Sequence, residues 1–175
     1  MAHKLPQISE LQTLSKSSQT TALDLLFEPS PAIQSTLLPV VRNAKYSSYS
    51  ELIDECRTAL FDLASNSAPS KPNPALLSVV GSHPRLGSKR VDSAQSAAEQ
   101  ANLQGDGEQL AELNREYEER FPGLRFVVFV NGRGRSEIMN DMRARIDRGD
   151  FAKEVDAALQ AMCDIAKDRA SKLLA

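Results

Sequence analysis

The sequence is poor in the residues that build disulfide frameworks and most metal centres. Among its 175 residues there are two cysteines, two histidines and no tryptophan. Cys56 and Cys163 are too few for a disulfide framework, and the four Cys and His residues lack the local spacing of a zinc site. We therefore expect no metal centre and no metal cofactor. If the chain uses imidazole chemistry, His83 is the better candidate, because His3 lies where a frayed terminus is expected.

The sequence also lacks an excess of charge and any long apolar run. Lys and Arg number 21 and Asp and Glu number 23, so the net charge of −2 favours neither a nucleic acid nor an anionic membrane as partner. The longest apolar run, Phe126–Val130, has five residues, whereas a membrane span needs about 18 or more. We expect no secretory signal and a cytoplasmic protein. Ser171-Lys172-Leu173 is followed by two more residues, so a peroxisomal C-terminal signal is not presented.

Helical patterns occupy nearly all of the chain. Pro31 suits the first position of a helix through Val41, and Ser48 to Glu51 form a capping box before an amphipathic stretch. Further helices are predicted over 93–103 and 108–121, from a cap at Ser136 to an end at Gly149, and from near Asp150 onward. Only Phe126–Val130 reads as a buried strand, and it has no visible partner strand. The pattern predicts an all-α fold, a single-domain multi-helix bundle over residues 1–175.

The first candidate site is the segment from His83 to Gly87. Pro84 restricts His83 to extended backbone conformations and makes the turn rigid. A histidine fixed at such a turn suits proton transfer near neutral pH. On the dipeptide alone, however, a structural His-Pro turn is the favoured interpretation.

The second candidate lies in Ser96-Ala97-Ala98-Glu99-Gln100. On a helix, Ser96, Glu99 and Gln100 share one face, which would aim a hydroxyl, a carboxylate and an amide in one direction. A carboxylate beside a histidine can orient the ring and stabilise its charged form. Taken alone, these residues are better explained as a solvated helix face.

The third candidate is the loop from Asn131 to Arg135. Asn131, Gly132, Arg133 and Arg135 precede a predicted helix, so backbone N–H groups and two arginines could bind an anion there. The loop is not a dinucleotide fingerprint, because the third glycine is missing. An exposed turn is the alternative. A nucleic-acid patch is disfavoured, because the arginines of residues 131–150 are nearly balanced by acidic residues.

Taken in order along the chain, these motifs resemble one family, the 2-oxo-4-hydroxy-4-carboxy-5-ureidoimidazoline (OHCU) decarboxylases of uric acid degradation. The resemblance covers essentially the whole chain. It is carried by the following motifs: His83-Pro84-Arg85-Leu86-Gly87, Ser96-Ala97-Ala98-Glu99-Gln100, Asn114 with Tyr117 and Phe121, Phe126–Val130, Arg135-Ser136-Glu137-Ile138, Arg145-Ile146, Glu154 and Arg169. The acidic residue that often follows His-Pro in the family is Arg85 here.

The resemblance implies an enzyme of the carboxy-lyase class with an all-α fold, often a homodimer, with no cofactor. It implies cofactor-independent conversion of OHCU to S-allantoin and CO₂, with His83 as the catalytic imidazole and Glu99 as its partner in proton transfer. The substrate-binding residues it implies are Pro84, Ser96, Gln100, Asn131, Gly132, Arg133 and Arg135, with Arg133 preferred over Arg135 as the arginine facing the substrate.

Two alternatives to this function remain open at the level of sequence. The chain could be a non-catalytic helical partner-binding module that keeps the fold, in which case His83, Glu99 and Gln100 would scatter over the surface. It could also be a decarboxylase of a related ureido or hydroxy acid. In each case the partners expected are a small molecule or another protein, with no nucleic acid and no membrane.

Overall fold

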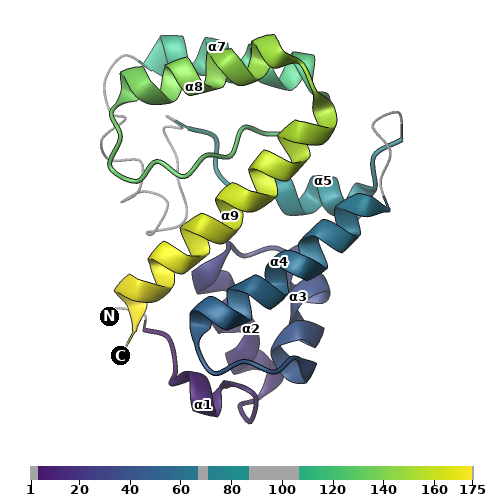
Figure 1. Cartoon of the computed structure of the whole chain (residues 1–175), viewed down its shortest axis with the longest axis vertical. Coiled ribbons are helices and arrows are strands. Elements are labelled where there is room, and N and C mark those ends of the chain that lie inside the picture. Colours follow the sequence, from purple (N-terminus) through teal and green to yellow (C-terminus); the bar gives the residue numbers. More distant parts are fainter. Residues whose placement is uncertain (1–3, 67–70, 87–106, 175) are drawn as a thin grey trace.

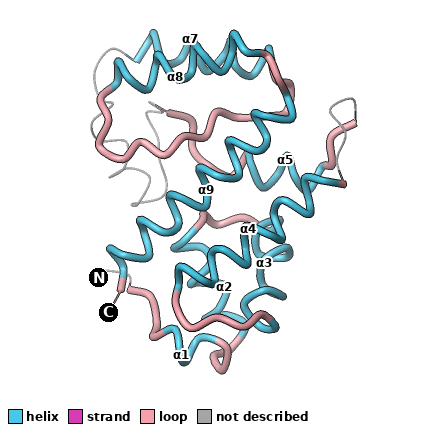
Figure 2. Tube along the Cα trace, in the orientation of Figure 1, coloured by secondary structure: helices cyan, strands magenta, loops and turns pink. Residues whose placement is uncertain are grey.

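A computed structural model describes residues 4–66, 71–86 and 107–174 of the chain. Within these ranges the secondary structure is helical, and no strand is present (Figures 1 and 2). The helices are α1 (Ile8–Leu11), α2 (Lys16–Leu26), α3 (Pro31–Asn43), α4 (Tyr49–Ser65), α5 (Pro74–Val80), α7 (Gly107–Arg120), α8 (Arg135–Arg148) and α9 (Phe151–Leu173). The predicted all-α class is therefore confirmed for this part of the chain.

Side-chain caps begin several of these helices where the sequence predicts them. The Oγ atom of Ser48 accepts a hydrogen bond from the backbone N–H of Glu51 at 3.1 Å, and a Glu51 carboxylate oxygen accepts from the N–H of Ser47 at 3.0 Å. Asp150 accepts from the N–H of Lys153 at 3.1 Å and so starts α9. Each cap satisfies a backbone donor that has no partner within the helix, which fixes where the helix begins.

The long helix α9 organises the core. It runs diagonally across the molecule, with α4 packed along it and with α2 and α5 against it (Figure 1). Helices α7 and α8 pack against each other at one end of the molecule. The two ends of the described chain meet, since the N–H of Leu5 donates to the carbonyl of Leu173 at 2.7 Å. None of the described helices is long and apolar enough to cross a bilayer.

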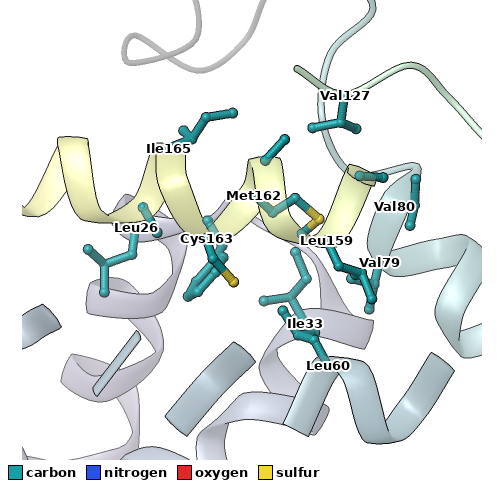
Figure 3. Close-up of a cluster of buried hydrophobic side chains, with 14 of the residues drawn as sticks. Leu26, Ile33, Leu60, Val79, Val80, Val127, Leu159, Met162, Cys163 and Ile165 are labelled. Carbon is teal, nitrogen blue, oxygen red and sulfur yellow. The ribbon is translucent and has the colours of Figure 1, made fainter. Parts of the chain in front are cut away.

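Three parts of the chain converge on one apolar cluster beside the end of α5. Figure 3 shows Val79 and Val80 of α5 with Leu159 and Met162 of α9, and Val127 lies nearby. All five side chains are buried. Burial of such side chains contributes roughly 1.5–3 kcal/mol each. The cluster therefore fixes the end of α5, three residues before His83, against α9 and the segment that contains Val127.

The segment Phe126–Val130 is buried, as predicted, except for the partly buried Phe129, but it is not part of a β-sheet in the described chain. Its backbone carbonyls accept hydrogen bonds from arginine side chains. In the described chain they do not pair with a neighbouring strand. Arg145 Nη1 donates to the carbonyl of Val127 at 3.1 Å, and Arg133 Nη2 donates to that of Phe129 at 2.6 Å. The expectation of a strand followed the Val/Phe composition, which reports burial more reliably than it reports sheet pairing.

A fully buried carboxylate ties this segment to three helices. Glu154, at the start of α9, accepts hydrogen bonds from Tyr117 Oη at 2.9 Å, Arg145 Nε at 2.8 Å and Arg148 Nη2 at 2.8 Å. The Arg145 guanidinium also lies over the ring of Phe126, 4.3 Å from its centroid. Because donors from α7 and α8 meet at one acceptor on α9, the network sets how the α7–α8 pair joins the rest of the molecule.

Candidate active site

His83 lies in a turn directly after α5 and is almost completely buried, with 5% of its surface exposed. The helix ends at Val80, where the N–H of Gly81 donates to the carbonyl of Leu77 at 2.8 Å. Within the described residues, the Nε2 atom of His83 has no hydrogen-bond partner. A buried ring nitrogen without a partner is uncommon in proteins and calls for an explanation, such as a functional role.

Two arginines from distant parts of the sequence lower the pKa of His83. Burial lowers the pKa of His83 most, and the positive charges of Arg169 on α9 and Arg125 lower it further, to about 3. The Arg125 guanidinium also touches the turn, since Nη1 donates to the backbone carbonyl of His83 at 2.6 Å. At neutral pH the imidazole is therefore uncharged and able to accept a proton.

Arg169 is itself buried and is held by the connection between α2 and α3. Its Nη2 atom donates to Oε1 of Glu28 at 3.0 Å, and its Nη1 atom donates to the carbonyl of Phe27 at 2.9 Å. Only 2% of Arg169 and 3% of Glu28 are exposed. A buried arginine with a charged partner and carbonyl acceptors is fixed in place, so the positive charge that lowers the pKa of His83 has a fixed position.

The Asn131–Arg135 loop forms a tight turn. Asn131 has φ of 49° and Gly132 has φ of 74°, which places both in the left-handed region. The Arg133 side chain folds back onto its own loop, where it binds the carbonyls of Phe129 and Val130 and reaches Asp141 at 3.4 Å. Within the described chain, no hydrogen bond or ion pair joins this loop to His83, so substrate binding by its residues stays a prediction.

The cap predicted after this loop is wrong by two residues. Gly134, and not Ser136, is the N-cap of α8, and it has no side chain to accept a hydrogen bond. The expected C-terminus of this helix is confirmed, because Gly149 follows it with φ of 63°.

The other predicted site residues divide between described and undescribed parts of the chain. Pro84 is partly exposed and immediately follows His83. Ser96, Glu99 and Gln100 lie outside the described residues, as do His3 and the helix predicted over 93–103. The pairing of His83 with Glu99 therefore remains a prediction.

Both cysteines are buried thiols. Burial is the main cause that raises the pKa of each, to about 12 for Cys163. A thiol with a raised pKa is protonated at neutral pH and is a poor nucleophile. Neither cysteine is a candidate for catalysis.

The sequence motifs predict no role in this site for Glu28, Arg125 or Arg169. Arg169 could have been found, because it lies on the apolar face of α9, four residues after Ile165 and three after Ala166. A charged residue at such a position is rarely buried unless it has a partner. Arg125 carries no comparable signal, because it lies in an irregular segment.

The fold and this site define an all-helical protein with a buried, uncharged histidine held near two arginines. The family model of OHCU decarboxylase matches residues 12–171. The chain therefore belongs to the OHCU decarboxylase family, a family of carboxy-lyases.

A solved structure has the same fold. The chain is similar to a crystal structure of (S)-allantoin synthase, with a TM-score of 0.63 and 16% sequence identity. The similarity covers 97% of this chain and 54% of that chain, so this chain spans about half the length of its structural relative. No curated protein sequence matches the chain.

Proposed function

We propose that this protein catalyses the decarboxylation of OHCU to S-allantoin and CO₂ without a cofactor. The observation that carries the proposal is the buried His83 of the His-Pro motif, uncharged and close to Arg125 and Arg169, in a chain that belongs to the OHCU decarboxylase family. The name of the structural relative, (S)-allantoin synthase, agrees with this product.

The substrate's own structure explains why no cofactor is needed. Its carboxylate is attached to a carbon that also bears a hydroxyl and lies next to a ring C=N bond. The imine accepts the electron pair released when CO₂ leaves, which is the task that a cofactor performs in many decarboxylases. The protein has to hold the carboxylate out of the ring plane and to move protons.

His83 suits both proton transfers. The lowered pKa leaves the imidazole unprotonated at neutral pH, and the carboxylate of Glu99, once paired with the ring, raises its basicity so that it accepts the hydroxyl proton of the substrate. The imidazolium that forms is disfavoured by burial and by the two neighbouring arginines. It therefore returns the proton readily to the enol-like intermediate. Delivery to one face of that intermediate gives the S product.

The remaining roles follow the family resemblance. Glu99 pairs with His83, and Pro84, Ser96 and Gln100 contact the substrate together with the loop of residues 131–135. The buried charge of Arg169 adds a local positive potential, which an anionic substrate needs because the protein as a whole has a net charge of −2. We also propose a homodimer and a cytoplasmic location, with a small molecule as the only other partner.

The test is a decarboxylation assay on freshly generated OHCU, with the spontaneous reaction subtracted. His83→Ala and Glu99→Ala should each lower kcat by a factor of about 100 or more. His3→Ala is the matched control, because it removes the other histidine of the chain, and it should keep full activity. If His83→Ala keeps a rate near that of the wild type, the assignment of His83 is wrong.

Product chirality separates this proposal from its two alternatives. Urate is converted to OHCU by the two preceding enzyme activities, and circular dichroism then follows the formation of S-allantoin. A non-catalytic binding module would leave only the slow racemic product of the spontaneous reaction. A decarboxylase of a related ureido or hydroxy acid would also leave OHCU to its spontaneous reaction, but it would release CO₂ from the related acid.

A further inference from the structure

Side chains from one region of the molecule hold both ends of the turn that contains His83. At one end, Arg125 Nη1 donates to the carbonyl of His83 at 2.6 Å. At the other end, Asn114 Nδ2 donates to the carbonyl of Leu86 at 3.0 Å. Between them, Arg85 forms two hydrogen bonds with the carboxylate of Glu118, at 2.9 and 2.8 Å. The turn is thus fixed at three points over four residues.

The three contacts come from α7 and the segment that follows it. Asn114 and Glu118 are four residues apart on α7, so they lie on one face of the helix. Arg125 follows shortly after the end of that helix. The turn itself continues from α5, which packs against α3, α4 and α9. It is therefore held on one side by the helical core and on the other by α7.

The three contacts differ in burial. Asn114 is 4% exposed, and its Oδ1 atom has no partner among the described residues, so its only described side-chain hydrogen bond is the one to Leu86. The Arg85 side chain is 51% exposed, and such ion pairs contribute little to stability. The two carbonyl contacts, from Asn114 and Arg125, are therefore the ones expected to fix the turn.

We propose that Asn114 and Arg125 are positioning residues that orient the His83 imidazole through the backbone of its turn. This inference rests on the proposed function, in which His83 is the catalytic base. No described side chain bonds to Nε2 of the ring, so the described contacts place the ring through its backbone, and in the proposed function Glu99 completes its orientation. Pro84 already restricts the backbone of His83, and the hydrogen bonds to the carbonyls of His83 and Leu86 hold the turn at both ends.

Two variants separate positioning from the effect of charge. Asn114→Ala removes one carbonyl contact and no charge. Arg125→Lys keeps the positive charge and loses the geometry of the guanidinium. Each should lower kcat by a factor of about 10 to 100 and leave KM within about twofold, because a small misplacement of a catalytic group costs rate and leaves substrate binding in place. Arg125→Ala should lower kcat at least as much as Arg125→Lys.

The matched controls are exposed residues on α7. Gln109→Ala is the neutral control for Asn114→Ala, and Arg115→Gln is the charged control for the Arg125 variants. Within the described residues, no hydrogen bond or ion pair joins either side chain to the turn. Both variants should keep wild-type kcat and KM. Thermal unfolding, followed for all variants, checks that they are folded at the assay temperature.

A second readout needs no substrate. In a His3→Gln background His83 is the only histidine, so its ¹⁵N imidazole signals can be followed by NMR as pH changes. In Asn114→Ala the titration midpoint of His83 should rise by about one pH unit or more, because the loosened turn admits water. In Gln109→Ala the titration midpoint of His83 should stay at its wild-type value.

The two readouts distinguish the failure of this inference from the failure of the proposed function. If the wild type does not decarboxylate OHCU, the proposed function is wrong, and the NMR titration still tests the control of His83 by the turn. The positioning role is overturned if Asn114→Ala and Arg125→Lys leave the His83 titration unchanged. It is also overturned if they raise KM with kcat unchanged, since that would place these residues on the substrate.

Discussion

Nη2 of Arg169 donates to Oε1 of Glu28 at 3.0 Å, which joins two residues 141 positions apart in the sequence. Both side chains are buried, and the positive charge of Arg169 lowers the pKa of His83. The pair connects α9 to the segment between α2 and α3, so one contact serves both the packing of these helices and the electrostatics of the candidate site.

Breaking this buried pair should destabilise the protein strongly. Arg169→Ala or Glu28→Ala should each lower the free energy of unfolding by about 3–5 kcal/mol, because each leaves a buried charge without its described partner. Urea unfolding measures the loss. The double variant Glu28→Gln/Arg169→Met should recover much of the stability, since it buries no charge, but not the decarboxylase activity.

The control for this prediction is an exposed ion pair that joins the same long helix, α9, to α4. Lys167 lies 2.7 Å from Asp54, with side chains 41% and 59% exposed. Lys167→Ala should change the free energy of unfolding by less than about 1 kcal/mol. Equal losses from Arg169→Ala and Lys167→Ala would show that the buried pair is not important for stability.

Removal of the Glu154 carboxylate should loosen the attachment of the α7–α8 pair. Glu154→Ala leaves Arg145 buried without its carboxylate and should cost about 3–5 kcal/mol in the free energy of unfolding. Tyr117→Phe removes one of the three donors and should cost about 1 kcal/mol. Guanidinium unfolding of both variants provides the comparison. A smaller loss for Glu154→Ala than for Tyr117→Phe would contradict the central role of the carboxylate.

Gly149 combines a left-handed backbone with a close neighbour. It has φ of 63°, and a Cβ atom there would meet the guanidinium of Arg120. Gly149→Ala should lower the melting temperature, with about 1–2 kcal/mol lost to the backbone alone. Gly132→Ala is the matched control, because Gly132 has φ of 74° with no atom near its Cβ position. If the two variants have the same melting temperature, the Arg120 side chain moves aside at no cost in stability.

The sequence predicts the helical class and several helix boundaries, because these depend on local patterns. The cap at Ser48 needs only residues within one helical turn, and the left-handed end at Gly149 needs only the preference of one residue type. Phe126–Val130 was predicted correctly as buried and wrongly as a strand, since apolar composition does not specify which groups bind the backbone carbonyls.

The candidate site depends on contacts that no local pattern encodes. His83 is singled out by its motif, but its pKa is lowered first by burial in the folded chain and then by Arg169, which is 86 positions away in the sequence. Arg125 donates to the carbonyl of His83 from an irregular segment, where periodicity gives no information. Arg133 was preferred as the substrate-facing arginine, whereas its described hydrogen bonds are to its own loop and to Asp141.

The lowered pKa of His83 predicts a loss of stability at mildly acidic pH. The imidazole has an ordinary pKa of 6.5 in the unfolded chain and a pKa of about 3 in the folded one. Between these values the unfolded state binds the proton and the folded state does not, so stability falls as pH falls from about 6.5 toward 3. From pH 7.5 to pH 5 the loss due to His83 should be about 2 kcal/mol.

A comparison of variants isolates this contribution from that of the carboxylates. His83→Gln removes the titrating group, so the difference in its free energy of unfolding between pH 7.5 and pH 5 should be smaller than that of the wild type by about 2 kcal/mol. His3→Gln should behave like the wild type, and urea unfolding at a series of pH values measures all three proteins. An identical pH dependence for His83→Gln and the wild type would mean that His83 keeps an ordinary pKa when folded. It would then be largely protonated below pH 6.5 and could not serve there as the base that accepts the substrate's hydroxyl proton.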